Sequence, residues 1–175
     1  MGLTRPEHLK IQFYSKRELK EVEETLLAQW KNVEAPALGI ERKGFVEEGL
    51  YVALGTHMVV DNRGAFVPFL GDEQLLKAFP YVVVDMGAVK FVTNGANIMR
   101  PGIRSFSGSF SKGDVVTVVD ERHGKALAVG SAMVDSVEAE KMEKGPVVRN
   151  LHYIGDKFWN AIRELDAEAG AKTQG

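Results

Sequence analysis

Residues 91–103, which read FVTNGANIMRPGI, hold the strongest fold signal in the chain. This stretch predicts a strand, a turn hinged on Gly95, one short helical turn and a second strand. Gly95 permits positive φ, Pro101 fixes φ and ends any helix, and Gly102 lets the backbone pass close to another group. Because a ligand-facing turn needs such close backbone approach, this stretch is the first candidate for a binding site.

Three further segments extend the pattern. Residues 112–120 (KGDVVTVVD) form a Gly-Asp entry into a Val-rich strand, and residues 126–133 (ALAVGSAM) form a strand of small and branched residues. With the Gly-Ala turn before Pro-Gly, they resemble the PUA domain, a small RNA-binding pseudo-barrel. Residues 150–159 (NLHYIGDKFW) resemble the ending of the malignant T-cell amplified sequence family and its archaeal relatives. Those proteins pair a PUA domain with an N-terminal pre-PUA domain.

The resemblance implies an α+β fold with two domains. Residues 1–86 are expected to form a mixed α/β pre-PUA domain, and residues 87–160 a PUA-type β pseudo-barrel with short helices. Residues 161–175 are expected to be the end of a C-terminal helix and a tail. Because two small domains each bury a modest fraction of their unfolded surface, roughly 60%, we expect them to pack on each other.

Strand and helix signals alternate in the first half. Ser15 and Glu18 have capping-box spacing, which predicts that a helix begins there. Asp72 is predicted to cap a short helix that ends at Pro80. The helix after Ser15 is expected to bury one apolar face, made by Leu19, Val22, Leu26, Leu27 and Trp30. The predicted strands are His8–Tyr14, Leu38–Arg42, Leu50–Leu54, His57–Val60, Ala65–Leu70 and Tyr81–Asp85, with a hairpin-like turn at Asp61–Gly64.

The second half predicts short strands separated by turns, as in a small barrel. Ser136 is predicted to cap a helical turn, and a C-terminal helix that includes Phe158 and Leu165 follows the last strand. A hairpin turn is predicted at Glu121–Lys125. The predicted strands are Ala88–Val92, Ile103–Phe106, Val115–Asp120, Ala126–Met133 and Val147–Tyr153.

Composition excludes several classes of protein. The 175 residues are 45% hydrophobic and 26% charged, with no cysteine, so no disulfide, thiolate nucleophile or cysteine zinc site is expected. The sequence contains no apolar run of about 18 residues, and a cytoplasmic location is expected. The net charge is −2, yet residues 86–160 carry ten Lys or Arg against eight Asp or Glu. This mildly basic second half suits a local nucleic-acid contact.

No catalytic or metal-binding motif is recognisable. Residues 108–113 (GSFSKG) have the glycine spacing of a phosphate-binding P-loop, but Asp114 and Val115 occupy the positions where Lys and Ser or Thr are required. His57 and His123 have no partner at metal-ligand spacing. The chain is therefore predicted to be no enzyme and to hold no cofactor and no metal.

RNA binding needs cations for phosphate and exposed faces for unstacked bases. The PUA resemblance implies a groove between the Gly-Ala turn with its following helix and the last strand. Arg100 and Arg149 are the best candidates for phosphate contacts, because a guanidinium fork matches phosphate geometry. Core packing is the alternative role for Met99, and a purely structural role for Gly95. The candidate RNA-binding residues are Lys90, Gly95, Ala96, Asn97, Met99, Arg100, Arg149, Asn150 and His152.

The predicted function is therefore non-enzymatic RNA binding related to translation. The family resemblance implies binding at the small ribosomal subunit, a PUA domain directed to the CCA end of tRNA, and a translation-factor partner. Two alternatives stay open. The acidic first half could recruit a protein, which would make the chain an adaptor without significant RNA affinity. The chain could also be an accessory subunit of an RNA-modification enzyme.

Overall fold

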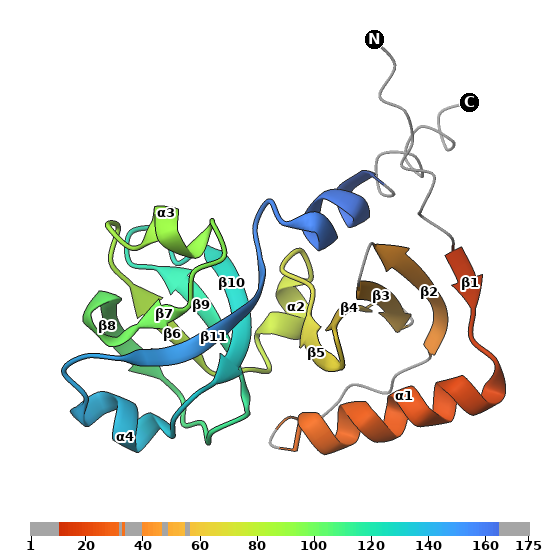
Figure 1. Ribbon diagram of the computed structural model, residues 1–175, viewed down its shortest axis with the longest axis horizontal. Helices are drawn as coiled ribbons and strands as arrows, with labels where there is room; N and C mark the ends of the chain where they lie inside the picture. The colour runs from red at the N-terminus through yellow and green to blue at the C-terminus, as the bar shows by residue number, and fades with distance from the viewer. Residues whose placement is uncertain (1–10, 32, 34–39, 47–48, 55–56, 165–175) are drawn as a thin grey trace, which may run out of the picture.

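The computed structural model describes residues 11–31, 33, 40–46, 49–54 and 57–164. Two sheets lie side by side, each with helices at its margins (Figure 1). The elements in chain order are β1 (Ile11–Phe13), α1 (Lys16–Gln29), β2 (Ile40–Val46), β3 (Gly49–Leu54), β4 (His57–Asn62), β5 (Ala65–Pro68), α2 (Glu73–Leu76), β6 (Tyr81–Val84), α3 (Val89–Val92), β7 (Ile98–Met99), the 3-10 turn η1 (Arg100–Gly102), β8 (Ile103–Ser107), β9 (Val115–Asp120), β10 (Ala126–Ala132), α4 (Ser136–Lys141) and β11 (Pro146–Tyr153). A C-terminal helix covers residues 157–164.

The first sheet has the order β1-β2-β3-β4-β5, and every pair in it is antiparallel. Helix α1 begins at the predicted capping box, in which Ser15 Oγ accepts from Glu18 N and Glu18 Oε2 accepts from Ser15 N. Leu26 on this helix is 1% exposed, and Trp30 after it donates Nε1–H to Phe66 O at 2.9 Å. These contacts confirm the predicted helix start and hold α1 against β5.

The predicted turn at Asp61–Gly64 is confirmed. Asp61 Oδ1 accepts from Gly64 N at 2.7 Å, and φ is positive at Arg63 and Gly64. The predicted strands of this half are observed with small shifts of their ends. Residues 8–10, 38 and 39 of the predicted strands lie outside the described residues.

The second sheet has the order β7-β11-β10-β9-β6-β8 and curls into a half-barrel. Strand β6 pairs in parallel with β9 and antiparallel with β8, so it belongs to this sheet although it precedes residue 86. The interior is packed with small branched side chains, among which Val82, Val116 and Val118 are fully buried. The predicted α+β class with a PUA-type half-barrel is confirmed.

Two local predictions for this half are wrong, and one strand was not predicted. Residues 89–92 form helix α3 instead of a strand, because Asp85 Oδ1 accepts from Ala88 N and the chain turns immediately after β6. Asp135 is the residue before α4, and the buried Ser136 hydroxyl instead accepts from Phe110 N at 3.1 Å. Strand β7 was missed because it is held only by pairing with β11.

One buried histidine ties the two sheets together. Leu70 N in the first half donates to His152 Nε2 on β11 at 3.2 Å, which leaves the ring proton on Nδ1. Nδ1 lies 2.8 Å from Asp156 Oδ2, and Asp156 Oδ1 accepts from Trp159 N at the start of the C-terminal helix. The His152 ring stacks on Phe69 at 5.5 Å between centroids. The expected packing of the two halves is therefore built around a neutral imidazole.

The C-terminal helix completes this junction. Phe158 is 1% exposed and Ile162 is 2% exposed, and both belong to a core cluster shared with the first sheet. This confirms the predicted helix, while Leu165 lies outside the described residues. In the described segments, none of the helices has the length and apolar character that a membrane crossing requires.

The β9–β10 turn is organised by one carboxylate. Asp120 is 4% exposed and accepts hydrogen bonds from three backbone N–H groups, those of Arg122, His123 and Lys125. These donors, foremost that of His123, lower the pKa of Asp120 below 3.8, against the opposing effect of burial. The ionised carboxylate therefore stabilises the folded turn.

We predict that Asp120→Asn lowers the urea midpoint of unfolding at pH 7. Because the folded pKa is depressed, the advantage of wild type should be complete above the unfolded pKa and lost as the pH falls below 3.8. Urea unfolding of both proteins at pH 7 and at successively lower pH measures this gap. A gap that stays constant down to pH 3, about one unit below the ordinary value, would contradict the assignment.

We predict that His152→Ala lowers the free energy of unfolding by about 3 kcal/mol, because it leaves Leu70 N–H without an acceptor, removes one hydrogen bond of Asp156 and opens a cavity beside Phe69. His123→Ala, on the exposed β9–β10 turn, is the control and should leave stability nearly unchanged. Chemical denaturation of both variants measures the difference. Equal stability of the two variants would show that the junction does not depend on the imidazole.

Candidate functional site

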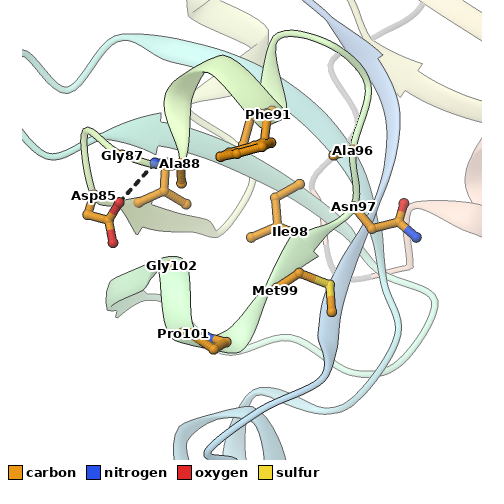
Figure 2. Close-up of a pocket in the computed structure, with 12 residues that line it drawn as sticks. Asp85, Gly87, Ala88, Phe91, Ala96, Asn97, Ile98, Met99, Pro101 and Gly102 are labelled. Carbon is orange, nitrogen blue, oxygen red and sulfur yellow. Dashed lines mark hydrogen bonds between the residues drawn. The ribbon is translucent and has the colours of Figure 1, made fainter.

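A pocket of about 390 Å³ lies between α3 and the β7–η1 segment (Figure 2). We call it the α3–β7 pocket. It coincides with the stretch that carries the strongest sequence signal. Its lining residues are Val84, Asp85, Gly87, Ala88, Phe91, Val92, Ala96, Asn97, Ile98, Met99, Pro101 and Gly102.

The loop between α3 and β7 is clamped to strand β11. Gly95 has φ of 91°, and a Cβ at this position would come within 3.0 Å of the Tyr153 ring. Both the backbone conformation and the lack of space therefore favour glycine here. Asn150 Nδ2 donates to Val92 O and Ala96 O, both at 3.0 Å. The Gly-Ala turn is thus fixed by contacts that sequence spacing alone does not reveal.

On the other side of the pocket, the η1 segment comes close to the start of α3 at Gly102. Its carbonyl accepts from Asp85 N at 2.9 Å, and a Cβ on Gly102 would lie 3.3 Å from Ala88 Cβ. Any larger residue here would push η1 away from the start of α3. Gly102 therefore sets the width of the pocket, as its predicted role in close backbone approach implies.

The pocket has a buried apolar floor and an exposed apolar rim. Ile98 and Val92 in the floor are each 2% exposed. At the rim, Phe91 from α3 is 58% exposed and Met99 from β7 is 47% exposed. Figure 2 shows both side chains around the hollow, with Ile98 between them. Two large apolar side chains exposed beside one cavity make this surface a candidate for binding.

Polar groups sit at two places around this apolar surface. Asp85 Oδ1 accepts from Ala88 N at 2.9 Å, while Oδ2 has no hydrogen-bond partner in the part of the chain that the structure describes. Lys90 Nζ lies 5.2 Å from the Phe91 ring centroid, which places a cation over the aromatic face. The pocket thus offers a flat ring, a free carboxylate oxygen and a neighbouring positive charge.

The predicted site residues divide into two groups. Ala96, Asn97 and Met99 line the pocket, and Lys90 is exposed beside it. Arg149 is exposed on β11 and forms no ion pair with the described residues. Phe91 and Asp85 were absent from the predicted site. Phe91 could have been included from the sequence, because this aromatic residue follows the candidate Lys90 directly and begins residues 91–103.

The remaining candidates make structural contacts within the fold. Arg100 donates Nε–H to Ala139 O at 2.8 Å and Nη1–H to Ile103 O at 3.1 Å, and its guanidinium lies over the Phe106 ring. Gly95 and Asn150 hold the loop as described. His152 is 0% exposed at the junction of the sheets, so the structure does not bring it to the pocket.

Comparison with known proteins places this architecture in a family. Residues 80–154 match the PUA domain family. An uncharacterized protein of Methanocaldococcus jannaschii is 38% identical over 157 residues, which cover 85% of this chain and 94% of the relative. Malignant T-cell-amplified sequence 2 of Homo sapiens is 37% identical over 106 residues, or 57% of each chain. The chain belongs to the malignant T-cell-amplified sequence family and its archaeal relatives.

Members of this family include a protein named for translation. Translation machinery-associated protein 20 of Saccharomyces cerevisiae is 39% identical over 90 residues, which span 48% of this chain and 50% of the yeast protein. The match thus covers about half the length of the yeast and human family members. The family resemblance inferred from the sequence is confirmed.

Solved structures of archaeal proteins share the fold. A PUA domain protein from Aeropyrum pernix, solved as a tartrate complex, has a TM-score of 0.65 and 28% identity, and the match covers 89% of this chain and 91% of that chain. A hypothetical protein from Pyrococcus horikoshii has a TM-score of 0.66 and 26% identity, with 87% and 99% covered. The likeness therefore extends through both sheets.

The two arginines of the predicted site should differ in stability. Arg100→Ala removes hydrogen bonds to backbone carbonyls on α4 and at Ile103, and we predict a loss of about 2 kcal/mol of unfolding free energy. Arg149→Ala removes an exposed side chain and should change stability by less than about 0.5 kcal/mol. Thermal and urea unfolding of the two variants provide the comparison. Equal losses would mean that the Arg100 contacts contribute nothing.

Proposed function

We propose that this chain is a non-enzymatic RNA-binding protein of translation that receives an unpaired base in the α3–β7 pocket. The observation that carries the proposal is the pair of exposed apolar side chains, Phe91 and Met99, beside a hollow that Asp85 also lines, whose Oδ2 has no hydrogen-bond partner among the described residues. An unstacked base has a flat apolar face and a polar edge, and this pocket has a surface for each.

Base stacking supplies the first part of the interaction. A base that leaves its helix or loop loses stacking partners, and an aromatic side chain replaces them with about 1–3 kcal/mol per base. Phe91 is half exposed and held by a short helix, so it offers such a face without rearrangement. Met99 supplies a polarizable thioether on the other side of the hollow.

Asp85 supplies selectivity in this proposal. Its Oδ2 accepts only, so it favours a base edge with an exocyclic amino group, as in cytosine or adenine. Lys90 and Arg149 are the exposed cations placed to neutralise phosphates next to the bound base. Such cations attract the RNA backbone through its phosphates without distinguishing the base sequence.

The RNA is proposed to be the acceptor end of tRNA or an unpaired segment at the small ribosomal subunit. The presence of a translation machinery-associated relative and the unpaired CCA bases of tRNA support this choice. The first sheet, in the proposed pre-PUA domain, would contact the ribosome or a translation-factor partner in the cytoplasm. No catalytic step is assigned to any residue.

The decisive experiment compares two exposed apolar residues of the second half. Phe91→Ala should weaken binding to intact tRNA by about 10-fold or more, because it removes the stacking face. Val137→Ala, on α4 and 63% exposed, is the matched control and should bind as wild type does. Fluorescence anisotropy with intact tRNA and with tRNA lacking its CCA end measures both. If Phe91→Ala binds intact tRNA as tightly as wild type, the pocket is not the RNA site.

A second variant tests the polar edge and the charge separately. Asp85→Asn keeps an oxygen for Ala88 N but replaces the free acceptor with a donor, so binding should weaken by about 5- to 10-fold for cytosine and adenine ends. Arg149→Ala should reduce the slope of log affinity against log salt by about 0.7, the value of one phosphate contact to single-stranded RNA. Unchanged affinity and slope would remove these groups from the interface.

A further inference from the structure

A second hollow lies where the two halves of the chain meet. It has a volume of about 740 Å³ and is bounded by α2, β6, β9, the β9–β10 turn and the C-terminal helix. Figure 1 shows the C-terminal helix beside α2 at this junction. Its size is within the range of small-molecule sites, about 300–1,000 Å³. We call it the junction pocket.

One polar atom in this pocket is unexplained by the fold. Val116 and Val118 of β9 fill the half-barrel, so Thr117 between them faces the other way, toward the junction pocket that it lines. Thr117 is 3% exposed, and its Oγ1 has no hydrogen-bond partner among the described residues. A buried hydroxyl without a partner costs free energy that valine would avoid. The hydroxyl is buried in the pocket wall with its hydrogen-bonding capacity unused.

The wall around this hydroxyl is positively charged. Lys77, Lys125 and Arg163 line the pocket and form no ion pair within the part of the chain that the structure describes. Glu73 is the acidic side chain in the described lining. Lys125 stands on the turn that Asp120 holds through three backbone hydrogen bonds, so its backbone is fixed before any ligand arrives.

Aromatic faces complete the pocket. Trp159 lines it, with the Arg163 guanidinium 5.4 Å from its ring centroid, and Tyr81 is 40% exposed at its edge. Cations and a hydroxyl fit a phosphate, and a flat indole beside them fits a planar ring. A simple anion would use the charges and leave the aromatic faces unused.

We propose that the junction pocket binds a nucleoside phosphate. Thr117 Oγ1 and the ammonium group of Lys125 hold the phosphate oxygens, and the base lies against Trp159. The phosphate chemistry is shared by a free nucleotide and by the terminal nucleotide of an RNA chain. The site shares no lining residue with the α3–β7 pocket, so it stands or falls independently of the function proposed above.

Nuclear magnetic resonance titration of the full chain tests the proposal. Adenosine 5′-monophosphate should shift the amide resonances of Gly124 and Ala126, while adenosine without phosphate should bind at least about 10-fold more weakly. Inorganic phosphate should also bind more weakly than the nucleotide, because it leaves Trp159 unused. No shift at these amides with millimolar nucleotide, or equal binding of all three probes, would overturn the proposal.

Two variants and one control make the test specific. Thr117→Val keeps the shape of the side chain and removes the hydroxyl, so it should weaken nucleotide binding about 5-fold while stability stays equal or rises. Lys125→Ala, on an exposed turn, should weaken binding similarly, and Val137→Ala, which lies outside the lining of both pockets, should leave it unchanged. Wild-type nucleotide affinity in both pocket variants, or a loss of affinity in Val137→Ala as large as theirs, would overturn the assignment.

A competition experiment distinguishes a free nucleotide from the terminal nucleotide of an RNA chain as the ligand. A hexa-adenylate with a 5′-phosphate that displaces the mononucleotide with higher affinity identifies the end of an RNA chain as the ligand. A hexa-adenylate that fails to displace it identifies a free nucleotide. Both outcomes support a nucleoside phosphate site.

Discussion

The buried imidazole of His152 is the constraint on which the arrangement of this molecule depends. Its Nε2 accepts from Leu70 N in the first half, so Nδ1 carries the proton toward Asp156, whose other oxygen receives Trp159 N at the start of the C-terminal helix. The segment after β5, strand β11 and the start of the C-terminal helix are thereby joined by a network centred on one fully buried side chain. In such surroundings each donor and acceptor must be matched, because an unmatched one costs about 1–3 kcal/mol. The network accepts one relative placement of the two sheets.

That placement leaves two surfaces with different chemistry. The α3–β7 pocket lies within the second sheet and its margins, where glycines bring η1 against α3 and the Asn150 amide clamps the loop to β11. Its apolar rim and single free carboxylate oxygen suit a base. The junction pocket exists only because the halves meet, and it combines cations with an indole and a buried hydroxyl. The α3–β7 pocket is therefore formed by the half-barrel alone, whereas the junction pocket is formed where the half-barrel packs against the first half of the chain.

Sequence reasoning succeeded where short-range rules dominate. The capping box at Ser15, the turn at Asp61–Gly64 and the Gly95 hinge depend on residues within a few positions of each other, and all three are observed. It failed at residues 89–92, whose β-branched and aromatic side chains favour a strand, because the Asp85 side chain starts a helical turn there. It also missed β7, a two-residue strand that exists only by pairing with β11.

The sequence by itself determined the family, the order of most elements other than α3 and β7, and the stretch that forms the α3–β7 pocket, because glycine, proline and alternating valines restrict the backbone locally. Tertiary structure decided which of the predicted residues face that pocket. Arg100 has its donors directed to backbone carbonyls of α4 and of Ile103, and His152 is enclosed at the junction, while Phe91, which was absent from the predicted site, is exposed at the rim. Whether a polar side chain faces solvent or satisfies a distant backbone group depends on contacts far apart in the chain, and no local pattern encodes those contacts.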